Sequence, residues 1–335
     1  MAHGNLAFAR NYFAEINSIP RSIETLLTLD VPLARLYGMR PKPGADGALG
    51  HNRTGFFNIS YQRYALDFVI YGIAANHLPS LKHGVNGIRY GFSKQLSDGS
   101  FDASFLNRRK TDIGKRLSTA ALFLMSAAIS YQLIHHCPHR RKFLKQLTEI
   151  RLGIRRTTYW LTKNDLTLFL HDQDSAYNLI NDALAFIVTG EIYNNATLIK
   201  RGHIFLEIAL ELQRDDGSFI EHDGHDSSYQ ASNIVLLIYY MMFVKNRGYF
   251  NRAMRAIVTG IIWEKSRILP TGKVNSRDNT RRIQSYSTFS GRKSDINYSE
   301  VIKAFLWYCF FTKDLQSHIL ARQVFGFISK NKRID

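Results

Sequence analysis

Cysteine is scarce in this chain, with two residues among 335. Cys137 and Cys309 can form at most one disulfide and nothing in the pattern requires it, so cysteine usage leaves the redox compartment open. The first residues also lack the basic segment and long apolar stretch of a secretory signal. We therefore expect a cytoplasmic protein, unless a leader has been removed from a secreted or periplasmic one.

The common sequence motifs for metal binding, for nucleotide binding and for the nucleophilic serine of hydrolases are missing as well. The sequence has no G-x-x-x-x-G-K-[ST], no strand-framed G-x-G-x-x-G, no H-E-x-x-H and no G-x-S-x-G. The segment His135-His136-Cys137-Pro-His139 has no second ligand cluster, and the basic stretch after it repels a cation. We expect no metal and no cofactor.

Long apolar runs are limited to one segment, Leu117 to Ile134. Its length approaches that of a membrane-spanning helix. Polar residues interrupt it, namely Ser118, Thr119, Ser126, Ser130 and Gln132. We therefore expect a helix buried between other helices, and no membrane span.

Acidic residues are few relative to basic ones. Asp and Glu number 27 against 44 Lys and Arg, which gives a formal net charge of +17. Such an excess favours an anionic partner, which can be nucleic acid, an acidic polysaccharide or an anionic membrane. Because 45% of the residues are hydrophobic and 13% aromatic, the chain is expected to fold around a core.

Strand signals are scarce, whereas helical periodicity recurs from about Tyr61 to the C-terminus. It predicts an all-α fold, and consecutive helical hairpins of this kind close into an α/α toroid or open into a solenoid. Irregular hairpin lengths and long polar loops after alternate helices favour a complete or incomplete (α/α)5-6 toroid. One domain is expected over 51–335, with helices and a Pro/Gly-rich loop of 1–50 packed on it. The predicted hairpins pair 61–78 with 82–96, 117–135 with 141–161, 175–189 with 197–213, 230–245 with 249–264, and 298–313 with 316–330.

One phrase occurs twice, beginning at Gln95 and at Gln213. Both copies read Q-x-x-D-G-S-F and both close a run with helical spacing. Glycine supplies a left-handed turn, Asp and Ser cap backbone amides, and the aromatic residue packs back on the hairpin. A repeat of this kind indicates stacked helical hairpins.

The stretch after the second copy resembles the catalytic segment of the α/α-toroid polysaccharide lyases, namely the hyaluronate, chondroitin and xanthan lyases. The resemblance rests on Asp216-Gly-Ser-Phe-Ile-Glu-His222, on Tyr229 and on the apolar helix around Ile234–Ile238. Three features depart from the family: the His-to-Tyr interval is shorter, the β-sandwich domains that usually follow are not seen, and neither is a signal peptide. The resemblance implies catalytic roles for Asn178 (or Asn181), His222 with His225 as its rival, Tyr229, Arg277 and Arg281.

Further polar residues are candidates for binding substrate at the same rim. These are Asn52, Arg53, Asp226, Asn279, Arg282, Lys293 and Glu300. Taken singly, each candidate also has a structural explanation, because tyrosines pack, loop carboxylates cap helices, and basic loops are solvated.

The resulting functional expectation is a carbohydrate-active enzyme that cleaves an acidic, uronate-containing polysaccharide by β-elimination. An amide stabilises the developing enolate-like charge, a tyrosine acts as base and then acid, and arginines hold the carboxylate. No nucleic acid is expected as partner, and the oligomeric state is left open. Two alternatives stay open: a toroid glycoside hydrolase using carboxylates, and a non-enzymatic basic scaffold that binds a polyanion. The carboxylates available to a hydrolase are Asp216, Glu221, Asp226 and Glu300.

Overall fold

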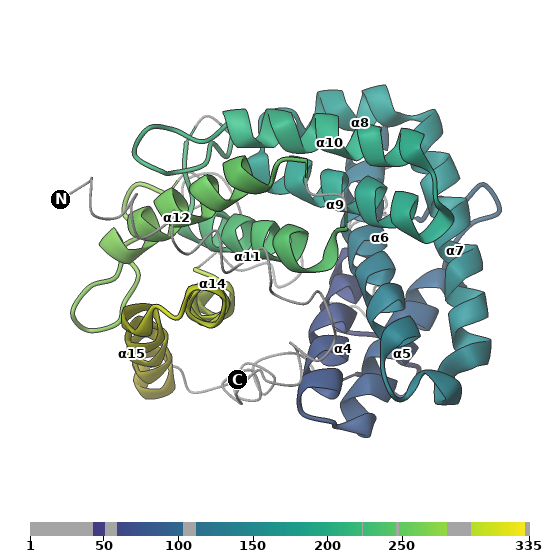
Figure 1. Cartoon of the computed structure of the whole chain (residues 1–335), viewed down its shortest axis with the longest axis horizontal. Coiled ribbons are helices and arrows are strands. Elements are labelled where there is room, and N and C mark those ends of the chain that lie inside the picture. The colour runs from purple at the N-terminus through teal and green to yellow at the C-terminus, as the bar shows by residue number, and fades with distance from the viewer. Residues whose placement is uncertain are drawn as a thin grey trace.

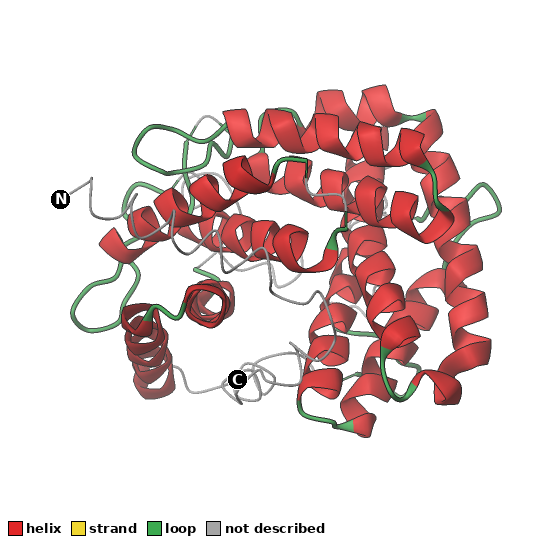
Figure 2. Cartoon of the chain, in the orientation of Figure 1, coloured by secondary structure: helices red, strands yellow, loops and turns green. Residues whose placement is uncertain are grey.

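The structure is a computed structural model that describes residues 43–50, 59–102, 112–222, 224–245, 248–279 and 296–331. Within these ranges the chain forms helices joined by turns and isolated bridges, and no strand is present (Figure 2). The predicted all-α class is confirmed. Of the expected N-terminal unit, only 43–50 is described, and there Ala48 and Leu49 are fully buried.

The described helices pack in consecutive pairs. The first members are α4 (Ala65–Ala74), α6 (Ile113–His136), α9 (Ala176–Tyr193), α11 (Ser227–Phe243) and α14 (Tyr298–Thr312). Their respective partners are α5 (Leu78–Ser93), α7 (Leu144–Lys163), α10 (Ala196–Glu211), α12 (Phe250–Ser266) and α15 (Leu315–Asn331). Short 3-10 helices precede two of them, η1 (Ile59–Tyr64) before α4 and η2 (Arg140–Phe143) before α7. The short helix α8 (Asp165–Asp172), between the second and third pairs, was not predicted from the sequence.

The first helices of successive pairs also pack on one another, α4 on α6, α6 on α9, α9 on α11, and α11 on α14. Figure 1 shows these inner helices following an arc from α4 to α14, with their partners outside it. The sequence explains the inner position, because a helix that is apolar on all sides must be covered on all sides. In α9 every residue from Leu179 to Gly190 is buried.

Helix α6 carries the longest apolar segment of the chain. By length and composition it is the one helix of the described residues that could cross a membrane, and 94% of its apolar window is buried inside the protein. The packing of α6 against α4, α7, α8 and α9 accounts for that burial. This agrees with the expectation of a helix enclosed by its neighbours.

The repeated turn has a third copy that the sequence did not reveal. In the first two copies an isolated bridge joins Gln95 to Phe101 and Gln213 to Phe219, and the same bridge joins Ile268 to Val274. The backbone hydrogen bonds recur too, as in Arg214 N to Ser218 O (2.8 Å) and its counterpart from Leu269 to Lys273 (2.9 Å). The third copy shares only its glycine with the other two, so the sequence motif did not identify it.

Each turn is fastened to the outer helix of the following pair. Gly217 has φ of +91°, and a Cβ there would lie 2.4 Å from the carbonyl oxygen of Thr259 in α12. The side chain of Gln213 completes this attachment by donating to the carbonyl of Ala256 (2.9 Å). Gly99 makes the same approach to α7, and Gly272 to α15. The turns therefore set the spacing between neighbouring pairs.

Candidate functional site

A polar cavity of about 340 Å³ lies where the inner helices begin. Its wall includes first-turn residues of α4, α6, α9, α11 and α14, together with η1. Its size is within the range of small-molecule sites. Because each helix N-terminus carries a partial positive charge, this convergence favours a negatively charged ligand. Among its polar side chains are Arg63, Lys115, Asn178, His222, Tyr229 and Glu300.

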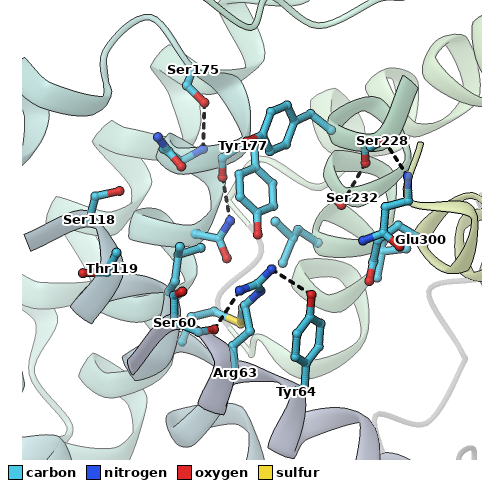
Figure 3. Close-up of a pocket in the computed structure, with 18 of the residues that line it drawn as sticks. Ser60, Arg63, Tyr64, Ser118, Thr119, Ser175, Tyr177, Ser228, Ser232 and Glu300 are labelled. Atoms are coloured by element: carbon cyan, nitrogen blue, oxygen red, sulfur yellow. Dashed lines mark hydrogen bonds between the residues drawn. The ribbon is translucent and has the colours of Figure 1, made fainter. Parts of the chain in front are cut away.

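Arg63 projects into the cavity from the end of η1 (Figure 3). Its guanidinium donates to Ser60 O (2.7 Å) and to the hydroxyl of Tyr64 (3.0 Å), and lies over the Tyr64 ring. Burial alone would lower the pKa of Arg63. The negative charges that Tyr64, Tyr177 and Glu300 can carry together outweigh this effect, so the pKa of Arg63 lies above its usual value. Arg63 is thus a fixed cation whose guanidinium N–H groups suit a carboxylate or sulfate.

Two tyrosines of neighbouring helices meet at the cavity wall. The rings of Tyr177 in α9 and Tyr229 in α11 lie 5.0 Å apart between centroids. Burial raises the pKa of Tyr177 to about 12, although the nearby Arg63 opposes this. Tyr177 is therefore a phenol at neutral pH and suits binding better than proton abstraction.

Asn178 is held from behind by a buried carboxyl pair. Its Nδ2 donates to Asp172 Oδ1 (2.8 Å), and Asp172 in turn contacts Asp182 of α9. Burial raises the pKa of Asp172 to about 7, while Ser118, Asp182, Lys115 and Asn178 work to lower it. Burial and the Asp172 charge raise the pKa of Asp182 well above its usual value. Two carboxyl groups in contact cannot both ionise readily, so the pair shares a proton.

Because of this carboxyl pair, we expect the stability of the protein to depend on pH, and we expect the substitution Asp182→Asn to reduce that dependence. Because the pKa of Asp172 is raised, the folded state binds more protons than the unfolded state between about pH 4 and pH 7. Stability should fall as pH rises through that window. With Asp182→Asn, the amide can donate to an ionised Asp172, and the loss between pH 5 and pH 8 should shrink by roughly 2 kcal/mol.

Urea denaturation of both proteins at the two pH values measures the difference. Glu221 also has a raised pKa of about 7 because of its burial, but it is present in both proteins and cancels. An unchanged pH dependence in the variant would show that the two carboxyl groups titrate independently.

Glu221 joins the start of α9 to α11 beneath the cavity. Its carboxylate accepts hydrogen bonds from Ser175 Oγ (2.6 Å), Tyr177 N (2.9 Å) and Asn233 Nδ2 (3.0 Å). The next residue, His222, adopts a left-handed backbone with φ of 48° and lines the cavity. Its Nδ1 lies 3.2 Å from Asp174 Oδ2, so a carboxylate orients the ring.

Charges at the two ends of the helix arc pair across the cavity. Lys303 Nζ of α14 contacts both oxygens of Asp67 in α4, at 2.9 and 2.8 Å, and Glu300 Oε1 at 3.1 Å. The Lys303 side chain is 6% exposed. Because these charges compensate one another, the cavity holds little of the chain's positive excess.

The structure brings some of the predicted site residues together and separates others. Asn178, His222, Tyr229 and Glu300 line the cavity, as does Asn181, the alternative to Asn178. Asn52, Arg53, Arg281, Arg282 and Lys293 lie outside the described residues.

The remaining candidates lie behind or outside the cavity wall. Asp226 caps α11 by accepting from Ser228 N (2.8 Å) and Tyr229 N (3.1 Å). The buried Asn279 lies 3.5 Å from Asp226 Oδ2, and Arg277 is exposed. His225 packs on Trp263 with 5.2 Å between ring centroids, and its Nε2 lies 3.3 Å from Asp278. Of the two rival histidines, His222 lines the cavity and His225 does not.

Sequence reasoning missed Arg63, which is the arginine of the described cavity wall. The signal available was Tyr61-Gln-Arg63-Tyr64, an arginine among tyrosines directly before an apolar helix. The expectation placed the arginines one hairpin downstream, because the family resemblance pointed there.

The four carboxylates weighed for a hydrolase are engaged in the structure. Asp216 accepts from Ser218 N (2.8 Å) within the turn, and Asp226 caps α11. Glu221 holds three donors, and Glu300 pairs with Lys303. Each of these four carboxylates therefore has a hydrogen-bonding or ion-pair partner within the protein.

Within the described ranges, no group of three His, Cys, Asp or Glu is placed to hold a metal ion. In the histidine-rich segment, His136 Nδ1 contacts Gln132 O (2.8 Å) and His139 Nε2 contacts Asn76 Oδ1 (2.8 Å). His135 stacks on Tyr131. These histidines have structural partners of their own.

Comparison with known proteins gives no independent guide to the site. No model of a protein family matches the sequence, and neither a curated protein nor a solved structure matches the chain.

Proposed function

We propose that the cavity is the active site of an enzyme that cleaves an acidic polysaccharide by β-elimination. The observation that carries the proposal is that Asn178, His222 and Tyr229, which come from separate segments, line one polar cavity. Arg63 adds a fixed positive charge, and the converging helix N-termini favour an anionic ligand. Because the cavity holds a sugar-sized volume, one uronate unit of a longer chain is the fitting substrate.

We further infer that the helix pairs form an incomplete (α/α)5 toroid. Successive inner helices pack on one another, and Lys303 and Asp67 link the last inner helix to the first. This arrangement accounts for polar residues from distant segments meeting at one end of the molecule.

The chemistry assigns a distinct task to each group. Arg63 and the Asn178 amide bind the uronate carboxylate and stabilise the negative charge that develops on it. The phenolate of Tyr229 takes the C5 proton, the electron pair forms the C4=C5 double bond, and the bond from C4 to the glycosidic oxygen breaks. Tyr229 returns the proton to the leaving oxygen, so no oxidant or other reactant is consumed. His222, oriented by Asp174, is placed to assist this proton transfer.

An absorbance assay on uronate-containing polymers tests the proposal. Hyaluronate, chondroitin and xanthan are incubated with the protein at several pH values while ultraviolet absorbance is recorded, because elimination creates a conjugated double bond. New reducing ends with rising absorbance are the expected result. New reducing ends without absorbance would show hydrolysis instead and would sink the elimination mechanism.

A further inference from the structure

A large share of the positive excess of this chain lies on one outer helix, away from the cavity. The segment formed by η2 and α7, residues 140–163, contains eight Lys and Arg and a single acidic residue, Glu149, which gives a formal charge of +7. The other outer helices carry far less, since α5, α12 and α15 are each at +2 and α10 is neutral. About two fifths of the net charge of +17 therefore belongs to helix α7 and the short helix η2 that precedes it.

All eight cations of this segment are exposed, namely Arg140, Arg141, Lys142, Lys145, Arg151, Arg155, Arg156 and Lys163. Within the described part of the chain, no ion pair involves any of them. Glu149 is neutralised by Arg89 of α5 at 2.8 Å. Like charges at this density repel one another, and an anionic partner removes the repulsion.

The cations follow the solvent side of α7, because the opposite side of the helix is packed. Ile150, Ile154 and Leu161 are fully buried against the core. Figure 1 shows α7 at the outer edge of the arc. A helix of 20 residues extends over about 30 Å, so the cations form a row rather than a broad surface.

The row ends near the level of the cavity. Lys115 and Ser118, near the start of α6, line the cavity. Helix α7 packs against α6 and runs antiparallel to it. The Arg116 guanidinium, in the first turn of α6, lies 5.7 Å from the Trp160 ring in the last turn of α7. The C-terminal end of α7 is thus at the same end of the molecule as the cavity.

We propose that the exposed face of η2 and α7 is a binding surface for a linear acidic polysaccharide, and that it anchors a chain longer than the cavity can hold. This inference rests on the proposed function for its substrate, but binding at α7 does not require turnover. A row one helix wide fits a single polymer chain, whereas a helix that binds an anionic membrane buries its apolar side in the lipid, and the apolar side of α7 is already packed in the core. Single-stranded nucleic acid is bound on several stacking rings, and α7 exposes one, Tyr159.

Charge-removing variants test the surface without disturbing the core. The triple variant Arg151→Gln, Arg155→Gln, Arg156→Gln removes three exposed cations and keeps good helix formers. The matched control, Arg255→Gln, Arg322→Gln, Lys330→Gln, removes the same charge from exposed positions on α12 and α15. Fluorescein-labelled heparin, as a sulfated linear polyuronate, is titrated with each protein at low and moderate salt.

The α7 variant should bind heparin roughly tenfold more weakly and with a shallower salt dependence, while the control stays within about twofold of the wild type. Equal weakening in both variants would overturn the proposal, because net charge alone would then govern binding. Tighter α7-dependent binding of single-stranded RNA or of phosphatidylserine vesicles than of heparin would overturn it in favour of those partners.

Activity measurements separate this proposal from that of the cavity. Tyr229→Phe should keep heparin binding, whether or not the protein turns over any polymer. If the wild type is active, the α7 variant should raise KM for long chains several-fold and leave kcat for short oligosaccharides unchanged. Equal KM for long chains in the α7 variant and the wild type would show that the surface does not anchor substrate.

Discussion

Under the proposed elimination mechanism, Tyr229→Phe is expected to lower turnover by roughly 10²- to 10⁴-fold, because the variant has no phenolate oxygen to take up and return the proton. The ring remains, so its packing against Tyr177 and the start of α11 should be preserved. KM should change little, since the Tyr229 oxygen matters in the transition state more than in binding. Initial rates of absorbance increase, together with the thermal unfolding midpoint, measure both effects.

Tyr177→Phe is the matched control for this prediction. Tyr177 is the neighbouring ring of the same cavity, and burial raises its pKa to about 12. Removing its hydroxyl should therefore cost less than roughly tenfold in kcat. Comparable losses in the two variants would mean that Tyr229 has no special role in proton transfer, and full activity of Tyr229→Phe would remove it from the mechanism.

The second large effect is expected from a substitution that the backbone conformation of a turn does not tolerate. Gly217→Ala should lower the free energy of unfolding by roughly 2–4 kcal/mol. The residue has φ of +91°, which L-residues rarely adopt, and a Cβ would lie 2.4 Å from Thr259 O. Because that oxygen belongs to the backbone of α12, the turn must move away from the outer helix and loosen the contact between pairs.

Gly326→Ala is the matched control for this change. Gly326 lies inside α15 and a Cβ there meets nothing within 4 Å, so alanine should raise stability by about 0.5–1 kcal/mol. Urea denaturation of both variants gives the comparison. A Gly217→Ala protein as stable as the wild type would mean that the turn does not hold the pairs in place.

The positions of the helices were largely readable from the sequence. Apolar spacing at 3.6 residues and polar breaks gave α9 as 175–189, against Ala176–Tyr193 in the structure. The helix α8 was missed because its eight residues continue the helical pattern of α7 after a short break. Local hydrogen bonding and capping act over a few residues, and so they leave a signal in a local pattern.

The sequence predicted only some of the residues that line the cavity. Asn178, His222 and Tyr229 were selected from the order of motifs along the chain, and all three line the cavity. Arg63 was not selected, since no local pattern tells that η1 will lie opposite α9 and α11. The engagement of Glu221 could not be read from the sequence, because its partner Ser175 lies 46 residues earlier in the chain.

By itself, the sequence determined the helical class, the turn that links the pairs, and a short set of polar residues near helix starts. Only the tertiary structure decided that His222 and not His225 faces the cavity, that a third turn exists without the shared letters, and that the cations of residues 140–163 all lie exposed on one side of a packed helix. The physical reason is the distance along the chain over which each interaction acts. Helix formation and capping depend on neighbours a few residues away, whereas a side chain's surroundings depend on which faces of distant helices pack together.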